Sequence, residues 1–384
     1  MIILIGACFL MSAVMGLGWN AIALLLTDIE TIQGWSRTEI SLGFSILVLV
    51  YTLLTPFIGV LASRYDSRVV GCTLAIVLAI GFGVAALANT VWQFYLGFGL
   101  LAGIGSHAFA SIIIFSLLID RVRKRTTTAI ALADSGTGFG MIAGFPVLHT
   151  VVTAYSWRGA LVFLAILALF TGLALYGAVL PPIRRMAGKR SRIGLLPKPA
   201  LGLVCLAAAA FLGAATLQGY QSHQIAIVDE LSGDRSMAVW IASLLGGIIF
   251  MWRAASGACI DRYGEGVAAA LCIGFTAIAC TAIYLHGILN AWPLLGVFAI
   301  GIGVGLGGQG ILVAAGTRRT FPRQAFAPAY GMIRLSNGIG LVAGPVVAGI
   351  GYDAFGHYGI VIIIFLTCAV FHFLLFCCAL RFSA

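Results

Sequence analysis

The feature that most constrains this chain is a series of long apolar stretches, separated by short polar breaks, that recurs along the whole sequence. A bilayer has a hydrocarbon core about 30 Å thick, which a helix of about 20 apolar residues crosses. Hydrophobic residues make up 61% of the sequence and charged residues 9%, whereas soluble domains have about 25% charged residues. We therefore predict an all-α integral membrane protein, because a soluble fold could not bury so much apolar surface.

Twelve of these stretches are long enough to span a bilayer, and we predict twelve transmembrane helices. We expect the first to be a spanning helix and not a signal peptide, since it has no basic beginning and runs to Asp28 before its first charge. The approximate ranges are 2–26, 39–62, 69–88, 92–119, 127–153, 159–180, 200–226, 236–260, 266–286, 290–314, 324–350 and 357–381.

The basic residues distinguish the two sides of the membrane. Alternate loops hold nearly all of them, and the remaining loops hold only Arg37, Arg158 and Arg235. The positive-inside rule places the basic loops in the cytoplasm. We therefore expect a multi-pass protein of the cell inner (plasma) membrane with both termini cytoplasmic. On this interpretation the net charge of +10 reflects topology and not a nucleic-acid-binding surface.

An internal repeat has a period near 200 residues, about half the chain. Because each half holds six helices, both halves enter the membrane from the same side and form parallel repeats. We predict an N-terminal six-helix half over 1–180, a basic cytoplasmic linker over 181–199 and a C-terminal six-helix half over 200–384. The matched pairs are Gly59 with Gly257, Gly103 with Gly303, Gly105 with Gly305, and Pro146 with Pro345.

Two loop segments, GVLASRYDSR and GACIDRYGE, resemble the signature G-x-L-x-D-R-x-G-R-R of the major facilitator superfamily. The first copy has Ser63 at the aspartate position, while the second keeps Asp261 and Arg262. The resemblance implies the major facilitator fold along essentially the whole chain. It also implies that Arg64, Asp261 and Arg262 belong to gating loops, which lock neighbouring helices on the cytoplasmic side in one state and release them in another.

Within that superfamily, the strings GWSRTEISLGFSI, AYSWRGALVFLA and FAPAYGMIRLSNGIGLVAGPVVAGIGYDAFGHYG resemble the monocarboxylate transporter and oxalate:formate antiporter group. The resemblance implies transport of organic anions through an arginine of the eighth helix, four residues before a glycine. Arg253, before Gly257, occupies this position. Asn20 and Asn337 stand where members of the group have lysines, and Ile249 stands where animal members have an aspartate.

Three ionisable residues, Asp134, Arg253 and Arg334, fall inside predicted spans. A charge at the centre of a bilayer costs at least about 2.5 to 3.5 kcal/mol, so each indicates a functional site. At about 1.5 Å per residue they share a depth of roughly 10 to 12 Å below the cytoplasmic face. The excess of arginine favours a small organic anion, since a planar guanidinium binds a carboxylate through two hydrogen bonds.

In the superfamily's arrangement the fifth helix abuts the eighth, so Asp134 and Arg253 could meet, and two interpretations of that contact stay open. In one, a substrate carboxylate competes with Asp134 for Arg253, and the displaced Asp134 takes a proton, which couples transport to protons. In the other, the two residues form a structural ion pair that holds the halves together.

Other polar residues inside the spans are candidates for the pathway. His223 and His107 could contact substrate or protons, or could be hydrogen-bonded interior residues. We predict a substrate-binding set of Arg253, Arg334, Asn20, His223, Asn337 and Gln309, with Asp134 as the proton-coupling residue. Further candidates for polar lining are Gln218, Gln221, Gln224, Tyr51, Tyr220 and Tyr330.

These features favour a secondary active transporter of a small organic anion, a monocarboxylate by resemblance, with proton coupling or anion exchange as alternatives. An exporter of drugs or other small metabolites and a non-transporting membrane sensor remain alternatives. We predict no enzymatic activity, because the sequence has no G-x-x-x-x-G-K loop, no metal-spaced cluster and no assembled nucleophile and base. The expected partners are the anion, protons or a counter-anion and the lipid bilayer, with no cofactor, metal or nucleic acid.

Overall fold

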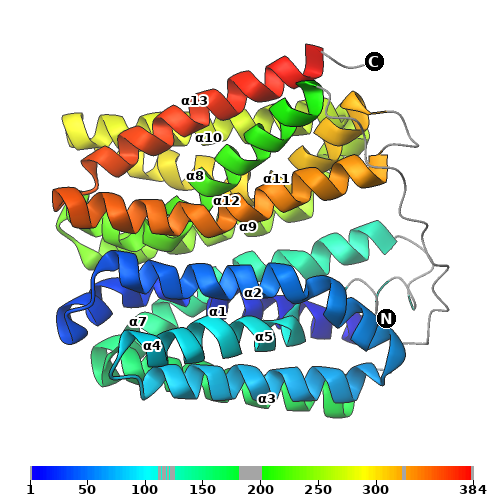
Figure 1. The fold of residues 1–384 in the computed structure, drawn as a ribbon, viewed down its shortest axis with the longest axis vertical. Helices are drawn as coiled ribbons and strands as arrows, with labels where there is room; N and C mark the ends of the chain where they lie inside the picture. Colours follow the sequence, from blue (N-terminus) through cyan, green and yellow to red (C-terminus); the bar gives the residue numbers. More distant parts are fainter. Residues whose placement is uncertain are drawn as a thin grey trace.

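The computed structural model describes residues 2–110, 114, 118, 121, 126–180, 201–321 and 326–381. Helices are the regular elements in these ranges, and strands are absent from them. The elements before residue 180 lie together below those that follow residue 200, and both chain termini lie at the same end of the molecule (Figure 1). The predicted linker over 181–199 lies outside the described residues.

The first group of elements, here the N-terminal group, has nine pieces of helix among the residues that the structure describes. Three long helices come first, and a series of short α, π and 3₁₀ turns follows. The bounds are α1 (Ile2–Gln33), α2 (Arg37–Arg64), α3 (Ser67–Ala86), α4 (Val91–Phe94), η1 (Tyr95–Leu101), α5 (Ala102–Gly105), η2 (Ser106–Phe109), α7 (Thr126–Ala174) and η3 (Leu175–Val179).

The second group, here the C-terminal group, has six long helices within the described ranges 201–321 and 326–381. They are α8 (Leu201–Ser232), α9 (Arg235–Tyr263), α10 (Glu265–Leu289), α11 (Pro293–Thr320), α12 (Phe326–Phe355) and α13 (Gly359–Arg381). In each group the first helix packs against a later one of the same group, α1 against α7 and α8 against α12.

Local sequence explains how the first two helices of each group form a tight hairpin. Gly34 and Gly233 have positive φ values of 70° and 68°, which glycine adopts at low cost after a helix end. Ser36 then caps α2 in a reciprocal capping box with Glu39, and Asp234 caps α9 by accepting a hydrogen bond from the Met237 amide. Both hairpins lie at the end opposite the termini (Figure 1), which we call the hairpin end.

Ten helices among the described residues are long and apolar enough to cross a membrane. Two departures from regular helix explain the difference from the twelve predicted spans. The segment Ala129–Val179 is one of the ten, yet Ser156 inside it has φ 64° and ψ 178°, which are not helical values. Two helices therefore meet at Ser156. Residues 91–109 form four consecutive short pieces and not one long helix.

Glycines allow the helices that border the seam to approach closely. A Cβ at Gly140 of α7 would lie 2.0 Å from the Ala13 carbonyl oxygen of α1, and one at Gly344 of α12 would lie 2.1 Å from the Ala215 carbonyl oxygen of α8. No larger residue fits at such a backbone contact.

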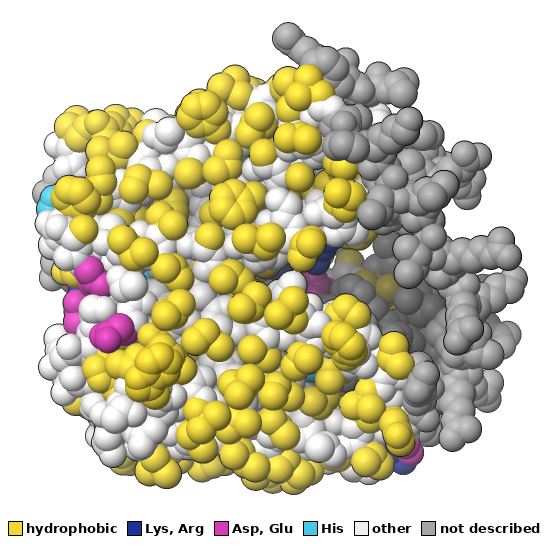
Figure 2. Space-filling view, viewed as in Figure 1, with side chains coloured by type: hydrophobic (Ala, Val, Ile, Leu, Met, Phe, Trp, Pro, Cys, Tyr) yellow, Lys and Arg dark blue, Asp and Glu magenta, His cyan; other side chains and the backbone are white. Residues whose placement is uncertain are grey.

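The two groups meet along a seam where α7 packs against α9, α2 against α12 and α1 against α8. Away from the seam, apolar side chains cover most of the visible face, as expected of a surface that faces lipid (Figure 2). The same view shows basic and acidic side chains inside a hollow between the groups.

Candidate functional site

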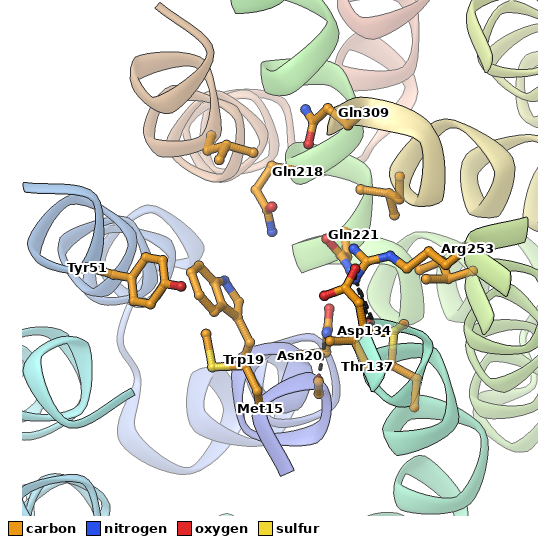
Figure 3. Close-up of a pocket in the computed structure, with 15 residues that line it drawn as sticks. Met15, Trp19, Asn20, Tyr51, Asp134, Thr137, Gln218, Gln221, Arg253 and Gln309 are labelled. Atoms are coloured by element: carbon orange, nitrogen blue, oxygen red, sulfur yellow. Dashed lines mark hydrogen bonds and ion pairs between the residues drawn. The ribbon is translucent and has the colours of Figure 1, made fainter. Parts of the chain in front are cut away.

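A cavity of about 230 Å³ lies on the seam between the two groups of helices. Seven of the described helices contribute to its wall, three from the N-terminal group and four from the C-terminal group, and Figure 3 shows their side chains converging on one space. The lining residues are Met15, Gly16, Trp19, Asn20, Tyr51, Asp134, Thr137, Met141, Gln218, Gln221, Ile249, Arg253, Leu306, Gln309 and Leu341.

The charged part of the wall is an ion pair between α9 and α7. Arg253 Nη1 lies 2.8 Å from Asp134 Oδ2 and 2.7 Å from Thr137 Oγ1, and it also approaches the Asp134 carbonyl at 3.4 Å. The contact expected between Asp134 and Arg253 is therefore present. The two side chains are 24% and 26% exposed, so both still face the open cavity.

Arg253 uses only one of its three guanidinium nitrogens in these contacts. Its Nε and Nη2 have no hydrogen-bond partner among the residues that the structure describes. A guanidinium binds a carboxylate most strongly through two parallel N–H···O bonds. Arg253 can therefore receive a carboxylate at its unused nitrogens while Nη1 holds Asp134.

Uncharged polar groups occupy other parts of the wall. Gln218 of α8 is only 6% exposed, and its amide nitrogen has no partner among the described residues. Gln309 of α11 also has an unpartnered amide nitrogen. Asn20 donates from Nδ2 to the Gly16 carbonyl one turn earlier, at 2.7 Å.

An aromatic surface forms the side of the cavity opposite the ion pair (Figure 3). The Trp19 and Tyr51 rings meet edge to face, with centroids 4.7 Å apart and planes at 76°. His107 stacks behind Tyr51 at 4.5 Å and 21°, and its Nε2 lies 3.1 Å from the Tyr51 carbonyl oxygen. His107 is fully buried, so it supports Tyr51 and does not line the cavity.

Two predicted residues of α12 lie outside the cavity wall. Arg334 is exposed and does not line the cavity. Asn337 is 2% exposed and donates to the Ala210 carbonyl at 3.4 Å. It lines a second cavity of about 20 Å³ inside the C-terminal group, to which Gln309 also contributes.

His223 lies at the contact between α8, α2 and α12 and not in the cavity wall. Its Nε2 is 2.9 Å from Ser41 Oγ and 3.2 Å from the Pro345 carbonyl oxygen, and its Nδ1 is 2.7 Å from the Tyr358 hydroxyl. Because the Pro345 carbonyl can only accept, a neutral His223 carries its proton on Nε2 and accepts from the Tyr358 hydroxyl at Nδ1.

The remaining candidates are two buried residues of α8 and the residues of the gating loops. Tyr220 and Gln224 are buried and lack hydrogen-bond partners for their side-chain polar atoms in the described part of the chain. Of the gating-loop residues, Arg262 is exposed with its guanidinium carbon 5.3 Å from the Tyr263 ring centroid. The side chains of Arg64 and Asp261 lie outside the described part.

Sequence reasoning missed a set of contacts that ties the two groups together at the hairpin end. Asp353 of α12 accepts hydrogen bonds from the backbone amides of Arg37 and Thr38, at 3.1 and 2.8 Å, and so caps α2 from the opposite group. The Arg37 guanidinium lies 3.4 Å from the Tyr352 ring centroid and binds Glu30 at 2.9 Å. We call these contacts the hairpin-end clamp.

A second ion pair of the clamp joins Arg235 of α9 to Asp28 of α1. Figure 2 shows acidic side chains gathered at this end of the seam. A sequence signal was available, because Arg37 and Arg235 are two of the three basic residues in the weakly basic loops. Their isolation there suggested specific partners.

Sequence reasoning also missed Trp19 and Thr137 in the cavity wall. Trp19 lies one turn after Met15, and Thr137 lies one turn after Asp134, on the same face of its helix. Helical spacing from Asp134 would therefore have identified Thr137. Trp19 could not be identified in this way, because apolar and aromatic residues are too frequent in this sequence.

Comparison with known proteins agrees with this architecture. The model of the Major Facilitator Superfamily matches residues 8–318. Solved structures with the same fold include the nucleoside transporter NupG, with a TM-score of 0.76 and 16% identity over 99% of this chain and 98% of that one. Another is a bacterial homologue of the human lysosomal transporter Spinster in an inward-facing, unoccupied conformation, with a TM-score of 0.72 and 14% identity over 99% and 97%.

Curated relatives include monocarboxylate transporters. Monocarboxylate transporter 13 of Rattus norvegicus is 25% identical over 82% of this chain and 73% of its own length. Human monocarboxylate transporter 11 is 27% identical over 72% of this chain. An uncharacterized 38 kDa protein of Thermoproteus tenax is 28% identical over 88% of this chain and 83% of its own length.

The chain spans 28% of human monocarboxylate transporter 7 and 55% of human monocarboxylate transporter 11, less than two thirds of either protein. The resemblance to monocarboxylate transporters is confirmed, and the homologues and structural neighbours are transporters and not enzymes. Because the family match over 8–318 covers most of the sequence, the chain belongs to the Major Facilitator Superfamily of membrane transporters.

Proposed function

We propose that this protein is a secondary active transporter of a small organic anion, a monocarboxylate, that works by alternating access. The observation that carries the proposal is Arg253, which faces a cavity on the seam and leaves Nε and Nη2 without partners among the described residues. A carboxylate fits these nitrogens. Relatives named monocarboxylate transporters support the same substrate class.

The proposed architecture has twelve spans in two parallel halves, 1–180 and 200–384, joined by a basic cytoplasmic linker over 181–199. The helix break at Ser156 supports separate fifth and sixth spans. Both termini lie at one end (Figure 1), which agrees with an even number of crossings. Gly140 and Gly344 make equivalent close contacts in the two groups, as expected of repeats.

In the proposed cycle the two halves rock against each other around the cavity. The hairpin-end clamp closes one end of the seam. Its contacts are the hydrogen bonds from the start of α2 to Asp353 and the ion pair between Arg235 and Asp28. By the positive-inside rule that end faces away from the cytoplasm of the cell inner membrane. The described state would then be closed on the outside, and its cavity would exchange with the cytoplasmic side.

Asp134 is the proposed coupling residue. Substrate carboxylate would compete with Asp134 for Arg253, and the released carboxylate would take a proton. Alternatively, the pair remains intact and the carrier exchanges one anion for another. The short contact between Arg253 and Asp134 is compatible with both schemes, because it uses a single guanidinium nitrogen.

Counterflow tests the proposal. Purified protein in proteoliposomes is preloaded with one acid from a panel of lactate, pyruvate, oxalate, formate and ring-containing acids, and entry of the same labelled acid is followed. Acceleration by a monocarboxylate is the expected result. If no carboxylate accelerates exchange, while a neutral metabolite or a cationic drug does, the anion assignment is wrong and the exporter alternative takes its place.

A further inference from the structure

We propose that the cavity selects monocarboxylates with a flat ring and an uncharged oxygen acceptor beyond it, such as hydroxylated aromatic acids, over short aliphatic acids. This inference rests on the proposed function, since it assumes that Arg253 binds the carboxylate. Three features of the cavity wall carry it: an unpartnered amide, a rigid aromatic surface and the position of the charge.

The unpartnered amide belongs to Gln218. Its side chain is 94% buried, it lines the cavity, and its Nε2 has no partner among the residues described. Buried N–H donors are nearly always paired in proteins, by protein, water or ligand. Figure 3 shows this amide directed into the space between Trp19 and the ion pair. A hydroxyl or carbonyl oxygen of a bound molecule would satisfy it.

The rigid aromatic surface consists of Trp19 and Tyr51. Their edge-to-face contact at 4.7 Å fixes the two rings relative to each other. His107 stacks on the far side of Tyr51 and is held by the Ile104 carbonyl, 3.0 Å from Nδ1. A fixed aromatic surface gives a flat apolar body extensive contact at little entropic cost.

The charge lies on one side only. Asp134 and Arg253 are the charged residues of the cavity wall in the described chain, and they face each other. The wall formed by Trp19, Tyr51 and Gln218 offers no cation to a second carboxylate. Arg334 does not line the cavity. The wall therefore favours a monoacid whose far end is polar and uncharged.

The size of the cavity agrees with a ring-containing substrate. A water molecule takes about 30 Å³ of liquid volume, so a cavity of about 230 Å³ leaves room for several waters beside lactate or pyruvate. Those small acids would leave Gln218 and the aromatic surface without contacts. A ring acid bridges all three sides.

The test is competition in the counterflow assay with a matched series of 4-hydroxybenzoate, benzoate and lactate. Because one buried hydrogen bond separates the first two acids, 4-hydroxybenzoate should compete at about tenfold lower concentration than benzoate. Lactate should be the weakest of the three. In Gln218→Leu the preference for the hydroxylated acid should fall to about twofold or less.

Gln224→Leu is the matched control, since Gln224 lies on the same helix with an equally unpartnered amide but does not line the cavity. It should keep the preference. Lactate competing as well as 4-hydroxybenzoate, or an unchanged preference in Gln218→Leu, would overturn the substrate class. The proposed function would survive either result as long as Arg253→Gln abolishes counterflow, whereas it fails with the inference if wild-type protein exchanges no carboxylate.

Discussion

Arg253 and Asp134 meet across the seam between α9 and α7, with Nη1 of the arginine 2.8 Å from Oδ2 of the aspartate. The contact joins two groups of helices that are far apart in the sequence. It also occupies only one nitrogen of the arginine among the described contacts, and both side chains remain about a quarter exposed. The pair can therefore hold the seam and still receive a ligand.

Replacing Arg253 with lysine should lower the initial rate of carboxylate counterflow by about tenfold or more. Lysine keeps the charge but is a point charge without the planar pair of donors that binds a carboxylate. Initial rates of counterflow in proteoliposomes measure the effect. Met251→Leu serves as the control, since Met251 is 64% exposed on the same helix; retained exchange in Arg253→Lys would contradict bidentate binding.

Asp134→Asn should separate proton coupling from a structural role. Asparagine still offers Arg253 a carbonyl oxygen, but it cannot exchange a proton with the cavity. We expect counterflow to continue while accumulation driven by a pH gradient is lost. The measurement is uptake of labelled acid with and without an imposed gradient. Undiminished accumulation would favour the structural ion pair.

Asp353→Ala should weaken closure at the hairpin end. The substitution removes the oxygens that cap the Arg37 and Thr38 amides, and loss of a cap costs about 1 kcal/mol. That energy corresponds to a several-fold larger open population. Spin labels are placed at the exposed residues Ile32 and Phe355, in a background without the nine native cysteines. The distribution of distances between the two labels should then gain a second, longer component. An unchanged distance distribution would show that the other clamp contacts suffice.

Gly140→Ala should destabilise the N-terminal group by about 1 to 3 kcal/mol, as expected of overpacking. The new Cβ would lie 2.0 Å from the Ala13 carbonyl oxygen, so α1 and α7 must separate. Gly274→Ala is the matched control, because no atom of another element lies within 4 Å of its Cβ position. Thermal unfolding in detergent compares the two, and equal melting temperatures would exclude the close contact.

The sequence alone determined the membrane class and selected the two residues of the central ion pair, whereas the expectation that they meet came from the resemblance to the superfamily. Each apolar stretch and each charge within it has a large transfer free energy of its own, which does not depend on what surrounds it in the fold. For this reason Asp134 and Arg253 could be selected as site residues before any contact was known, and the structure places both in one cavity.

Tertiary structure decided the rest of the site. Arg334, Asn337 and His223 lie in spans like Arg253, but none of the three lines the cavity: Asn337 faces the interior of the C-terminal group, and His223 packs between α8, α2 and α12. Trp19 and Gln218, in contrast, line the wall. The hairpin-end clamp likewise joins Asp353 to α2 across the seam. Such contacts depend on which faces of distant helices meet, a property of the packed assembly that the composition of a single helix does not contain.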